Sequence, residues 1–275
     1  MKGSLVARGT VVAVGLLLAA SAALAQTQPP KFVPQVGQPA KDGAWIPTSQ
    51  ELVNKMLDVA QVTPADFVID LGSGDGRIVI AAARRGARAL GIEYEPDLVK
   101  VSRANAAREG VSGRAEFVKA DFFESDFSKA TVITMFLRPD IVLKLRPKIL
   151  DLAPGTRVLS NSYEMGEWKA DETETIEDGC PHWCTALLWI VPAKVDGVWK
   201  MPQGALTFSQ QFQMVTGSYA AGGNTLPIVG GRLRGDQITF SAGTDQYRGR
   251  VNGAVIKGSV TSGGKEGAWR ATRTR

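Results

Sequence analysis

The chain has 275 residues, of which 44% are hydrophobic and 21% charged. This composition is typical of a globular protein with one large domain or two modest ones, and it excludes a largely disordered chain. The formal net charge is +5, and no basic run with interleaved aromatic residues occurs, so the sequence predicts no nucleic-acid partner.

Residues 1–25 have the pattern of a secretory signal peptide. Lys2 and Arg8 precede an uncharged apolar run over 11–24, and a small-x-small cleavage site ends at Ala25. The run is short for a membrane span of about 20 residues, which favours cleavage over a retained anchor. Because positive charge stays on the cytoplasmic side, we predict an exported, periplasmic protein, with association with the cell envelope as a further possibility.

A proline-containing lead-in without periodicity covers residues 26–43, and a domain that alternates strands and helices is predicted over 44–193. A helix is expected over 50–60, where apolar residues recur at helical spacing. Strands are expected near Phe67, Ala89, Ala115, Val132 and Val158. A closing hairpin is expected from strands at 172–176 and 186–191. This alternation predicts an α/β fold with a doubly wound, Rossmann-like parallel sheet.

A glycine-rich turn follows the first of these strands. Gly72, Gly74 and Gly76 form a G-x-G-x-G pattern, and glycine lets a ligand press against bare backbone. The dinucleotide fingerprint needs a small residue where Arg77 stands, and the turn lacks the G-K-[ST] ending of a P-loop. The turn therefore indicates a nucleotide-like cofactor of another kind, with a tight turn that binds no ligand as the alternative.

Three acidic residues follow the ends of predicted strands. Asp70 suits a ligand with a cationic amino group, and Glu93 stands where α/β nucleotide folds bind ribose hydroxyls. Asp121 could accept a hydrogen bond from an adenine amino group, with Phe122 packing nearby. S-adenosylmethionine (SAM) has all of these groups and a cationic sulfonium, so the acids favour SAM as the cofactor.

The run from Asp70 to Gly76, with Glu93 and Asp121, resembles the motifs of class I SAM-dependent methyltransferases. The runs Trp45-Ile46-Pro47-Thr48 and Leu145-Arg146-Pro147-Lys148 extend the resemblance to a small group of protein-lysine methyltransferases, which includes the enzyme that modifies the ATP synthase c-subunit. The resemblance implies methyl transfer to a protein amine, a lysine, with Thr48 near the methionine end of SAM. The cofactor-binding residues that it implies are Thr48, Asp70, Gly72, Ser73, Gly74, Asp75, Glu93 and Asp121.

The methyl acceptor is less constrained by the sequence. Methyltransferases of nucleic-acid bases carry a [DN]-P-P-[YF] motif where this chain has Phe136-Leu137-Arg138-Pro139-Asp140, which speaks against base methylation. Four aromatic side chains could hold or desolvate an amine: Trp45, Phe136, Tyr163 and Trp168. The alternative is packing in the core or at its rim, which is favoured for Phe136. No catalytic group can be assigned, and the oligomeric state stays open. A small-molecule methyltransferase is one alternative. Because SAM is made in the cytoplasm, an exported protein that binds SAM or an adenosine-type ligand without turnover is another.

Two cysteines, Cys180 and Cys184, flank Pro181-His182-Trp183. In an oxidising compartment two nearby cysteines often pair, so we predict a disulfide across the turn of the closing hairpin. A metal site is the alternative. Zinc typically takes four ligands, or three and a water molecule, whereas this cluster offers three ligands crowded into five residues.

Residues 194–275 differ from the preceding domain in composition and pattern, because glycine becomes frequent and helical periodicity stops. They predict a small antiparallel β domain, a meander or barrel, that serves as a stabilising appendage or a binding module. Residues 231–238 are echoed by 249–256, which places Gly235-Asp236 and Gly253-Ala254 at two-residue hairpin turns. One predicted strand carries apolar residues at alternate positions, namely Leu206, Phe208, Phe212 and Met214.

Overall fold

The computed structural model describes residues 1, 3 and 32–274. Apart from Met1 and Gly3, the predicted signal peptide over 1–25 lies outside the described residues, as does the lead-in up to position 31. Within the described part of the chain, no helix has the length and apolar character needed to cross a membrane.

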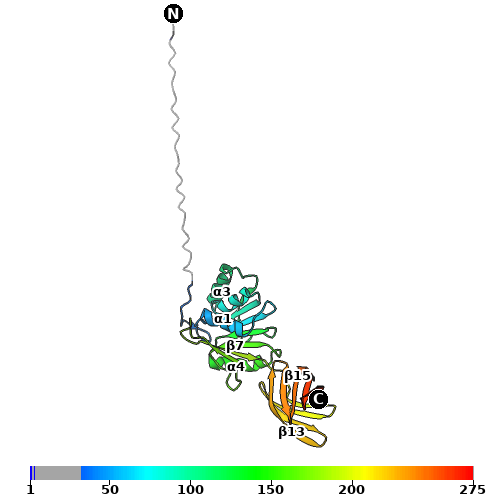
Figure 1. Ribbon diagram of the computed structural model, residues 1–275. Coiled ribbons are helices and arrows are strands. Elements are labelled where there is room, and N and C mark those ends of the chain that lie inside the picture. The colour runs from blue at the N-terminus through cyan, green and yellow to red at the C-terminus, as the bar shows by residue number, and fades with distance from the viewer. Residues whose placement is uncertain (2, 4–31, 275) are drawn as a thin grey trace. The chain divides into compact units, whose positions relative to one another are not determined.

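A seven-stranded sheet forms the centre of the N-terminal part of the described chain (Figure 1). Its strand order is β5-β4-β3-β6-β7-β9-β8, in which the first five strands are parallel and the β9–β8 hairpin is antiparallel. The predicted doubly wound sheet and its closing hairpin are therefore confirmed. The strands are β3 (Phe67–Leu71), β4 (Arg88–Glu93), β5 (Ala115–Lys119), β6 (Val132–Met135), β7 (Arg157–Asn161), β8 (Glu172–Thr175) and β9 (Thr185–Ile190).

Helices cover both faces of this sheet. Successive side chains of β3 point to opposite faces, so Val68 and Ile69 belong to two different apolar cores. The first core contains residues of α1, α2 and α3, and the second contains residues of α4. The helices are α1 (Gln50–Val59), α2 (Arg77–Arg84), α3 (Pro96–Arg108) and α4 (Pro139–Leu150).

The strand order creates a natural ligand position at β3. The chain passes from β3 to β4 on one side and later returns to β6 on the other side. The connection after β3 leads to β4 on one side, and the connection after the neighbouring strand β6 leads to β7 on the other side. In open α/β sheets a crevice forms between the carboxyl ends of two such strands. The glycine turn that begins at Gly72 lies at this end of β3.

The C-terminal part forms a closed barrel of eight antiparallel strands, so the predicted β-rich region is a barrel. Each strand pairs with the next, and β17 pairs with β10 to close it. Gly235-Asp236 and Gly253-Ala254 form two-residue turns between paired neighbours, as predicted. The strands are β10 (Gly197–Met201), β11 (Gly204–Gln211), β12 (Met214–Ala221), β13 (Asn224–Arg234), β14 (Gln237–Ala242), β15 (Asp245–Asn252), β16 (Val255–Ser262) and β17 (Lys265–Arg273).

The single strand predicted to carry Leu206, Phe208, Phe212 and Met214 is wrong. β11 ends before Phe212, which adopts φ 54° in the turn before β12. Leu206 and Phe208 point into the barrel, whereas Met214 is exposed. Phe212 leaves the alternating pattern because its ring stacks on Trp168, with the ring centroids 5.9 Å apart.

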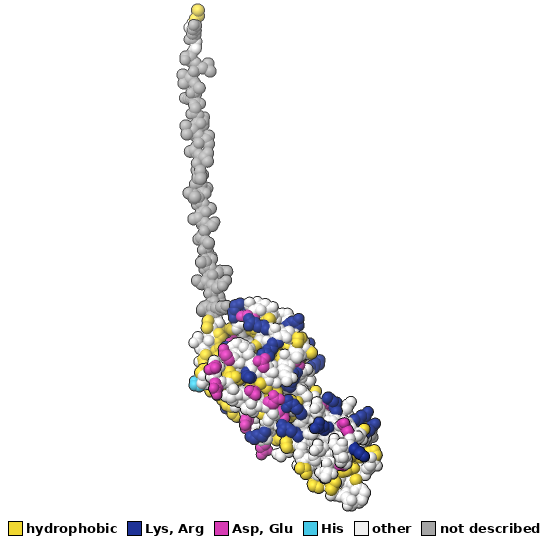
Figure 2. Space-filling view, viewed as in Figure 1, with side chains coloured by type: hydrophobic (Ala, Val, Ile, Leu, Met, Phe, Trp, Pro, Cys, Tyr) yellow, Lys and Arg dark blue, Asp and Glu magenta, His cyan; other side chains and the backbone are white. Residues whose placement is uncertain are grey.

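Charge is distributed unevenly along the chain. Residues 194–275 contain eleven Lys and Arg but only four Asp and Glu, and basic side chains gather over the barrel in Figure 2. Two of them form ion pairs with residues at the start of β8, Arg232 with Asp171 and Arg234 with Glu172. Opposite charges therefore help to attach the barrel to the edge of the sheet.

A buried ion pair joins the starts of the central strands. The Asp66 carboxylate accepts hydrogen bonds from Thr63 and Thr131 and pairs with the Arg157 guanidinium. Burial acts to raise the pKa of Asp66, but these partners together hold that pKa below its ordinary value. The charged form of Asp66 thus stabilises the junction of β3, β6 and β7.

We expect Asp66→Ala to lower the free energy of unfolding by about 2–3 kcal/mol at neutral pH, because it removes charge-assisted hydrogen bonds from a buried cluster. Since the pKa is depressed by folding, this contribution is present above the unfolded pKa of about 3.9 and is lost as the pH falls below it. Urea unfolding at pH 7 and pH 3 measures both effects. Asp151→Ala, which breaks an exposed pair with Lys194, is the control and should change stability by no more than about 0.5 kcal/mol. Equal losses for the two variants would contradict the prediction.

Candidate functional site

A pocket of about 320 Å³ opens where β3, β4 and β6 end. This volume falls within the range of small-molecule sites. Asp121 is the one predicted cofactor residue outside the lining. The predicted residues that line it are Thr48, Asp70, Gly72, Ser73, Gly74, Asp75 and Glu93.

The glycine turn at the pocket floor depends on its lack of side chains. Gly74 has φ 53°, and a Cβ there would lie 2.5 Å from Nε1 of Trp45. Gly76 has φ 85°, and its Cβ would lie 2.7 Å from the Phe117 ring. Side chains would therefore both strain the backbone and displace packed neighbours. The bare turn lets the Trp45 indole lie directly against it.

Asp70 is a buried carboxyl group at the end of β3. It is 2% exposed and accepts one hydrogen bond from the Thr134 hydroxyl at 2.7 Å. Burial, with repulsion from Glu93 and Asp75, raises the pKa of Asp70 to about 7. Within the part of the chain that the structure describes, no lysine or arginine forms an ion pair with it. A ligand with a positive charge would supply the missing partner.

Glu93 fastens the end of β4 to the glycine turn. One carboxylate oxygen accepts from the Gly74 amide at 2.8 Å and the other from the Glu95 amide at 2.9 Å. Burial raises the pKa of Glu93 even though these hydrogen bonds oppose the shift. Each oxygen keeps a lone pair, so the carboxylate can still accept hydrogen bonds from a pair of hydroxyls in the pocket.

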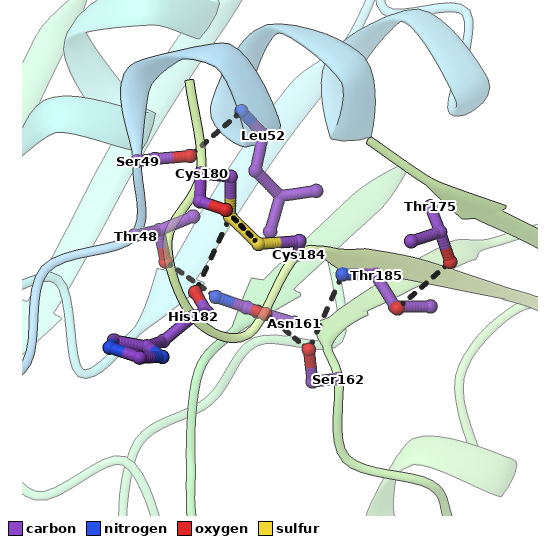
Figure 3. Close-up of a disulfide and its surroundings, with 10 residues drawn as sticks. All are labelled: Thr48, Ser49, Leu52, Asn161, Ser162, Thr175, Cys180, His182, Cys184 and Thr185. Atoms are coloured by element: carbon purple, nitrogen blue, oxygen red, sulfur yellow. Dashed lines mark hydrogen bonds between the residues drawn. A yellow bond between two sulfur atoms is a disulfide. The ribbon is translucent and has the colours of Figure 1, made fainter. Parts of the chain in front are cut away.

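Arg77 clamps the segment before α1 onto the turn. Its guanidinium donates to the Asp75 carboxylate, at 2.6 Å for the closest contact, and to the Thr48 carbonyl at 2.6 Å. The Thr48 hydroxyl accepts from Asn161 at the end of β7 (3.2 Å, Figure 3). From the sequence alone, Arg77 served only to exclude a dinucleotide cofactor. Asp75, two residues before Arg77, was the one local sequence signal for this contact.

Asp121 lies beside the pocket and has a partner within the chain. Its carboxylate pairs with Lys41, a contact that lowers the pKa of Asp121, and it also accepts from the Phe123 amide. The Lys41 ammonium lies 4.2 Å from the centroid of the Tyr94 ring, and both residues line the pocket. The adenine role of Asp121 stays a prediction. Lys41 was missed because the lead-in has no periodicity that would indicate a site.

Three of the four aromatic residues proposed for the acceptor side line the pocket, namely Trp45, Phe136 and Tyr163. Phe136 and Tyr163 stack with their centroids 5.9 Å apart and an angle of 22° between the rings. The assignment of Trp168 is wrong. Its side chain is fully buried between Trp189 and Phe212, where it contributes to the core beside the barrel.

The predicted disulfide between Cys180 and Cys184 is present, in the loop that joins β8 to β9. Figure 3 shows a chain of hydrogen bonds to the pocket from Thr185, the first residue of β9 after this loop. The Thr185 amide donates to the Ser162 hydroxyl, which donates to Asn161, which in turn donates to Thr48. The loop is therefore connected to the wall of the pocket.

Together these groups fit SAM. Asp70 can face a cationic group, and Glu93 can accept from a ribose diol. Phe136 and Tyr163 provide an apolar wall, which suits a reaction that requires a partly desolvated nucleophile.

Comparison with known proteins assigns the family. The family model of the ANTKMT methyltransferase domain matches residues 70–172. A protein-lysine N-methyltransferase of Saccharolobus islandicus is 44% identical over 138 residues, which cover 49% of this chain and 86% of the relative. The human ATP synthase c-subunit lysine N-methyltransferase is 41% identical over 128 residues, or 46% of this chain, and the match spans only 54% of the human protein.

One solved structure is also similar to this chain. An RNA methyltransferase from Salinibacter ruber, crystallised in complex with S-adenosyl-L-homocysteine, is 46% identical with a TM-score of 0.51. The match covers 55% of this chain and 96% of that protein. The shared fold and the bound product of that relative agree with SAM as the cofactor. The chain therefore belongs to the protein-lysine N-methyltransferase family of SAM-dependent methyltransferases.

Proposed function

We propose that this protein transfers a methyl group from SAM to the side-chain amine of a lysine in a protein substrate. The observation that carries the proposal is the stacked pair of Phe136 and Tyr163 in the wall of the same pocket that holds Asp70 and Glu93. The names of the relatives from Saccharolobus islandicus and human support lysine as the acceptor.

The chemistry is a displacement at carbon. The lysine ammonium first gives up a proton to water. The neutral nitrogen then forms a bond to the methyl carbon while the carbon–sulfur bond of SAM breaks, and its electron pair stays on the sulfur of the departing S-adenosylhomocysteine. Free lysine has a pKa of about 10.4, so the amine must be deprotonated before it can attack. Phe136 and Tyr163 contribute by taking the amine out of water, which favours its neutral form. Positioning in a dry pocket then supplies much of the rate enhancement.

The sequence of this chain after β6 favours protein over RNA as the substrate class. The Salinibacter ruber relative is described as an RNA methyltransferase. However, the segment after β6 is Phe136-Leu137-Arg138-Pro139-Asp140, which lacks the [DN]-P-P-[YF] motif of base amino-methyltransferases. The bulky aromatic at its first position faces Tyr163 instead.

Incubation of purified protein with methyl-labelled SAM tests the proposal. Separate reactions receive cell-envelope protein, total RNA or a small-molecule extract. We expect label in protein, in a lysine after hydrolysis. Label in RNA or in small molecules alone would overturn lysine as the acceptor. Tight SAM binding with no transfer to any class would favour a binding protein without turnover.

We expect SAM affinity to depend on Asp70 and on pH. The charged carboxylate is the form that attracts a cation, so the dissociation constant should rise as the pH falls through about 7, by up to about tenfold per pH unit. Asp70→Asn should bind SAM at least tenfold more weakly at pH 8 and lose this part of the pH dependence, while Glu116→Gln on the exposed face of β5 should bind as the wild type does. Calorimetric titration measures all three proteins. Identical pH profiles for wild type and Asp70→Asn would contradict the prediction.

We also propose that the protein is exported and acts in the periplasm as a cleaved chain. The basic residues and apolar run before Ala25 support export, and the disulfide between Cys180 and Cys184 is typical of oxidising compartments. Residues 44–193 would then act as the methyltransferase domain and 194–275 as an attached barrel. SAM would have to be supplied to that compartment, so its presence in protein purified from the periplasm is informative.

Expression of the full chain in a Gram-negative host should yield a periplasmic protein whose first residue is Gln26. Mass spectrometry of the intact protein, with and without alkylation, measures the cleavage site and the absence of free thiols together. Replacement of Leu16 and Leu17 by arginine interrupts the apolar run and should keep the chain uncleaved in the cytoplasm. An uncleaved wild-type chain in the cytoplasmic fraction would overturn the proposal.

A further inference from the structure

The loop between β8 and β9 lies at the same edge of the sheet as the pocket. The last residue of β7, Asn161, pairs with Ala186 near the start of β9, and Thr175 at the end of β8 pairs with Thr185. The segment from 176 to 184 therefore projects from the edge where Asn161 contacts Thr48. This loop adjoins the pocket but contains none of the predicted cofactor-binding residues.

The loop presents one aromatic ring toward the pocket. The Trp183 ring centroid lies 5.8 Å from that of Phe136, which itself stacks on Tyr163. Phe136 and Tyr163 line the pocket, whereas Trp183 is 39% exposed. The three rings thus form a continuous aromatic track from the surface to the pocket.

Trp183 is held in a conformation that the backbone disfavours. Its φ of 53° lies in the left-handed region, which is costly for a bulky residue and persists where the surroundings enforce it. Here the enforcing contacts are the disulfide and the hydrogen bond from the Ile176 amide to the Cys184 carbonyl at 3.0 Å. On its other side the loop packs against α1, since a Cβ on Gly179 would lie 2.6 Å from the Glu51 side chain.

The chemistry of this track suits a lysine side chain. Aromatic faces attract an ammonium group, and their apolar surface packs against the methylenes that carry it. Glu177 and Asp178, exposed in the same loop, have no ion-pair partner within residues 32–274 and would favour the approach of a cationic segment.

We propose that Trp183, fixed by the disulfide-closed loop from Cys180 to Cys184, binds the lysine-bearing segment of the protein substrate and guides its amine along Phe136 and Tyr163. The inference rests on the proposed function and adds a binding role for a loop outside the cofactor site. Because the disulfide fixes Trp183, substrate affinity depends on the oxidised state of the loop, whereas SAM affinity does not.

An octalysine peptide is the probe. Its binding to the full mature chain saturated with S-adenosylhomocysteine is measured by calorimetry, and its methylation by initial rates. We expect Trp183→Ala to weaken peptide binding and raise KM by about tenfold with SAM affinity unchanged, and Trp183→Phe to recover most of the loss. Cys180→Ser with Cys184→Ser should shift both quantities in the same direction. Dithiothreitol should weaken peptide binding and raise KM for the wild type, and it should leave the double variant unchanged.

Val229→Ala, at a 61% exposed position on the barrel, is the matched control and should leave both quantities unchanged. Thermal unfolding identifies any variant that fails to fold. Wild-type peptide affinity in folded Trp183→Ala, an equal loss of SAM affinity, or absence of peptide binding to the wild type would each overturn the inference. Peptide binding through Trp183, with no methyl transfer by the wild type to the peptide or to cell-envelope protein, would instead overturn the proposed function, and the binding role of Trp183 alone would stand.

Discussion

The site is built around the close contact between a bare backbone turn and the Trp45 indole. The ring packs so closely against Gly74 that any side chain at this position would clash with it. Arg77 holds the same N-terminal segment by a hydrogen bond to the Thr48 carbonyl. These two contacts bring a segment that belongs to neither the sheet nor its helices over the end of β3. The pocket exists because the turn provides the floor and this segment provides a wall. The floor has positive φ angles at Gly72, Gly74 and Gly76, which glycine adopts without strain. The wall depends on the same angles because Trp45 packs against Gly74.

The electrostatics of the pocket follow from this enclosure. Burial alone disfavours charge on Asp70, and the nearby carboxylates disfavour it further. Glu93 differs because backbone amides on both of its oxygens compensate part of the effect of burial. Among the described residues, Asp70 therefore lacks a cationic partner, while Glu93 serves as a fixed acceptor. A ligand with a positive charge at one end and a diol further along satisfies both groups.

Much of this arrangement could be predicted from local signals. The alternation of strands and helices predicted the sheet, and the turn dipeptides Gly235-Asp236 and Gly253-Ala254 predicted two hairpins of the barrel. Contacts between distant segments could not be predicted. Nothing near Trp168 indicates that Phe212, 44 residues later, stacks on it and removes it from the acceptor side. The alternation of apolar residues also continues across the turn at Phe212. Since alternation alone does not reveal where a strand ends, it predicted one strand where the structure has two.

Lys41 and Trp183 illustrate the same limit at the site itself. Each is a single residue in a segment without regular periodicity, and each gains its meaning from a partner far along the chain, Asp121 for one and Phe136 for the other. Composition and spacing identify residues that act through the backbone of their own turn, as Gly74 does. They do not identify residues brought to a site by the packing of loops.

The strand arrangement has a consequence for self-association. The barrel closes through β10 and β17 and so presents no free edge, whereas the seven-stranded sheet has edges at β5 and β8. Unpaired edges are templates for pairing with another chain. β8 is only four residues long, and its exposed sequence Glu172-Thr173-Glu174-Thr175 has no apolar side chain. A strand this short, with only polar and charged side chains, is a poor template for pairing, so this edge resists strand-to-strand aggregation.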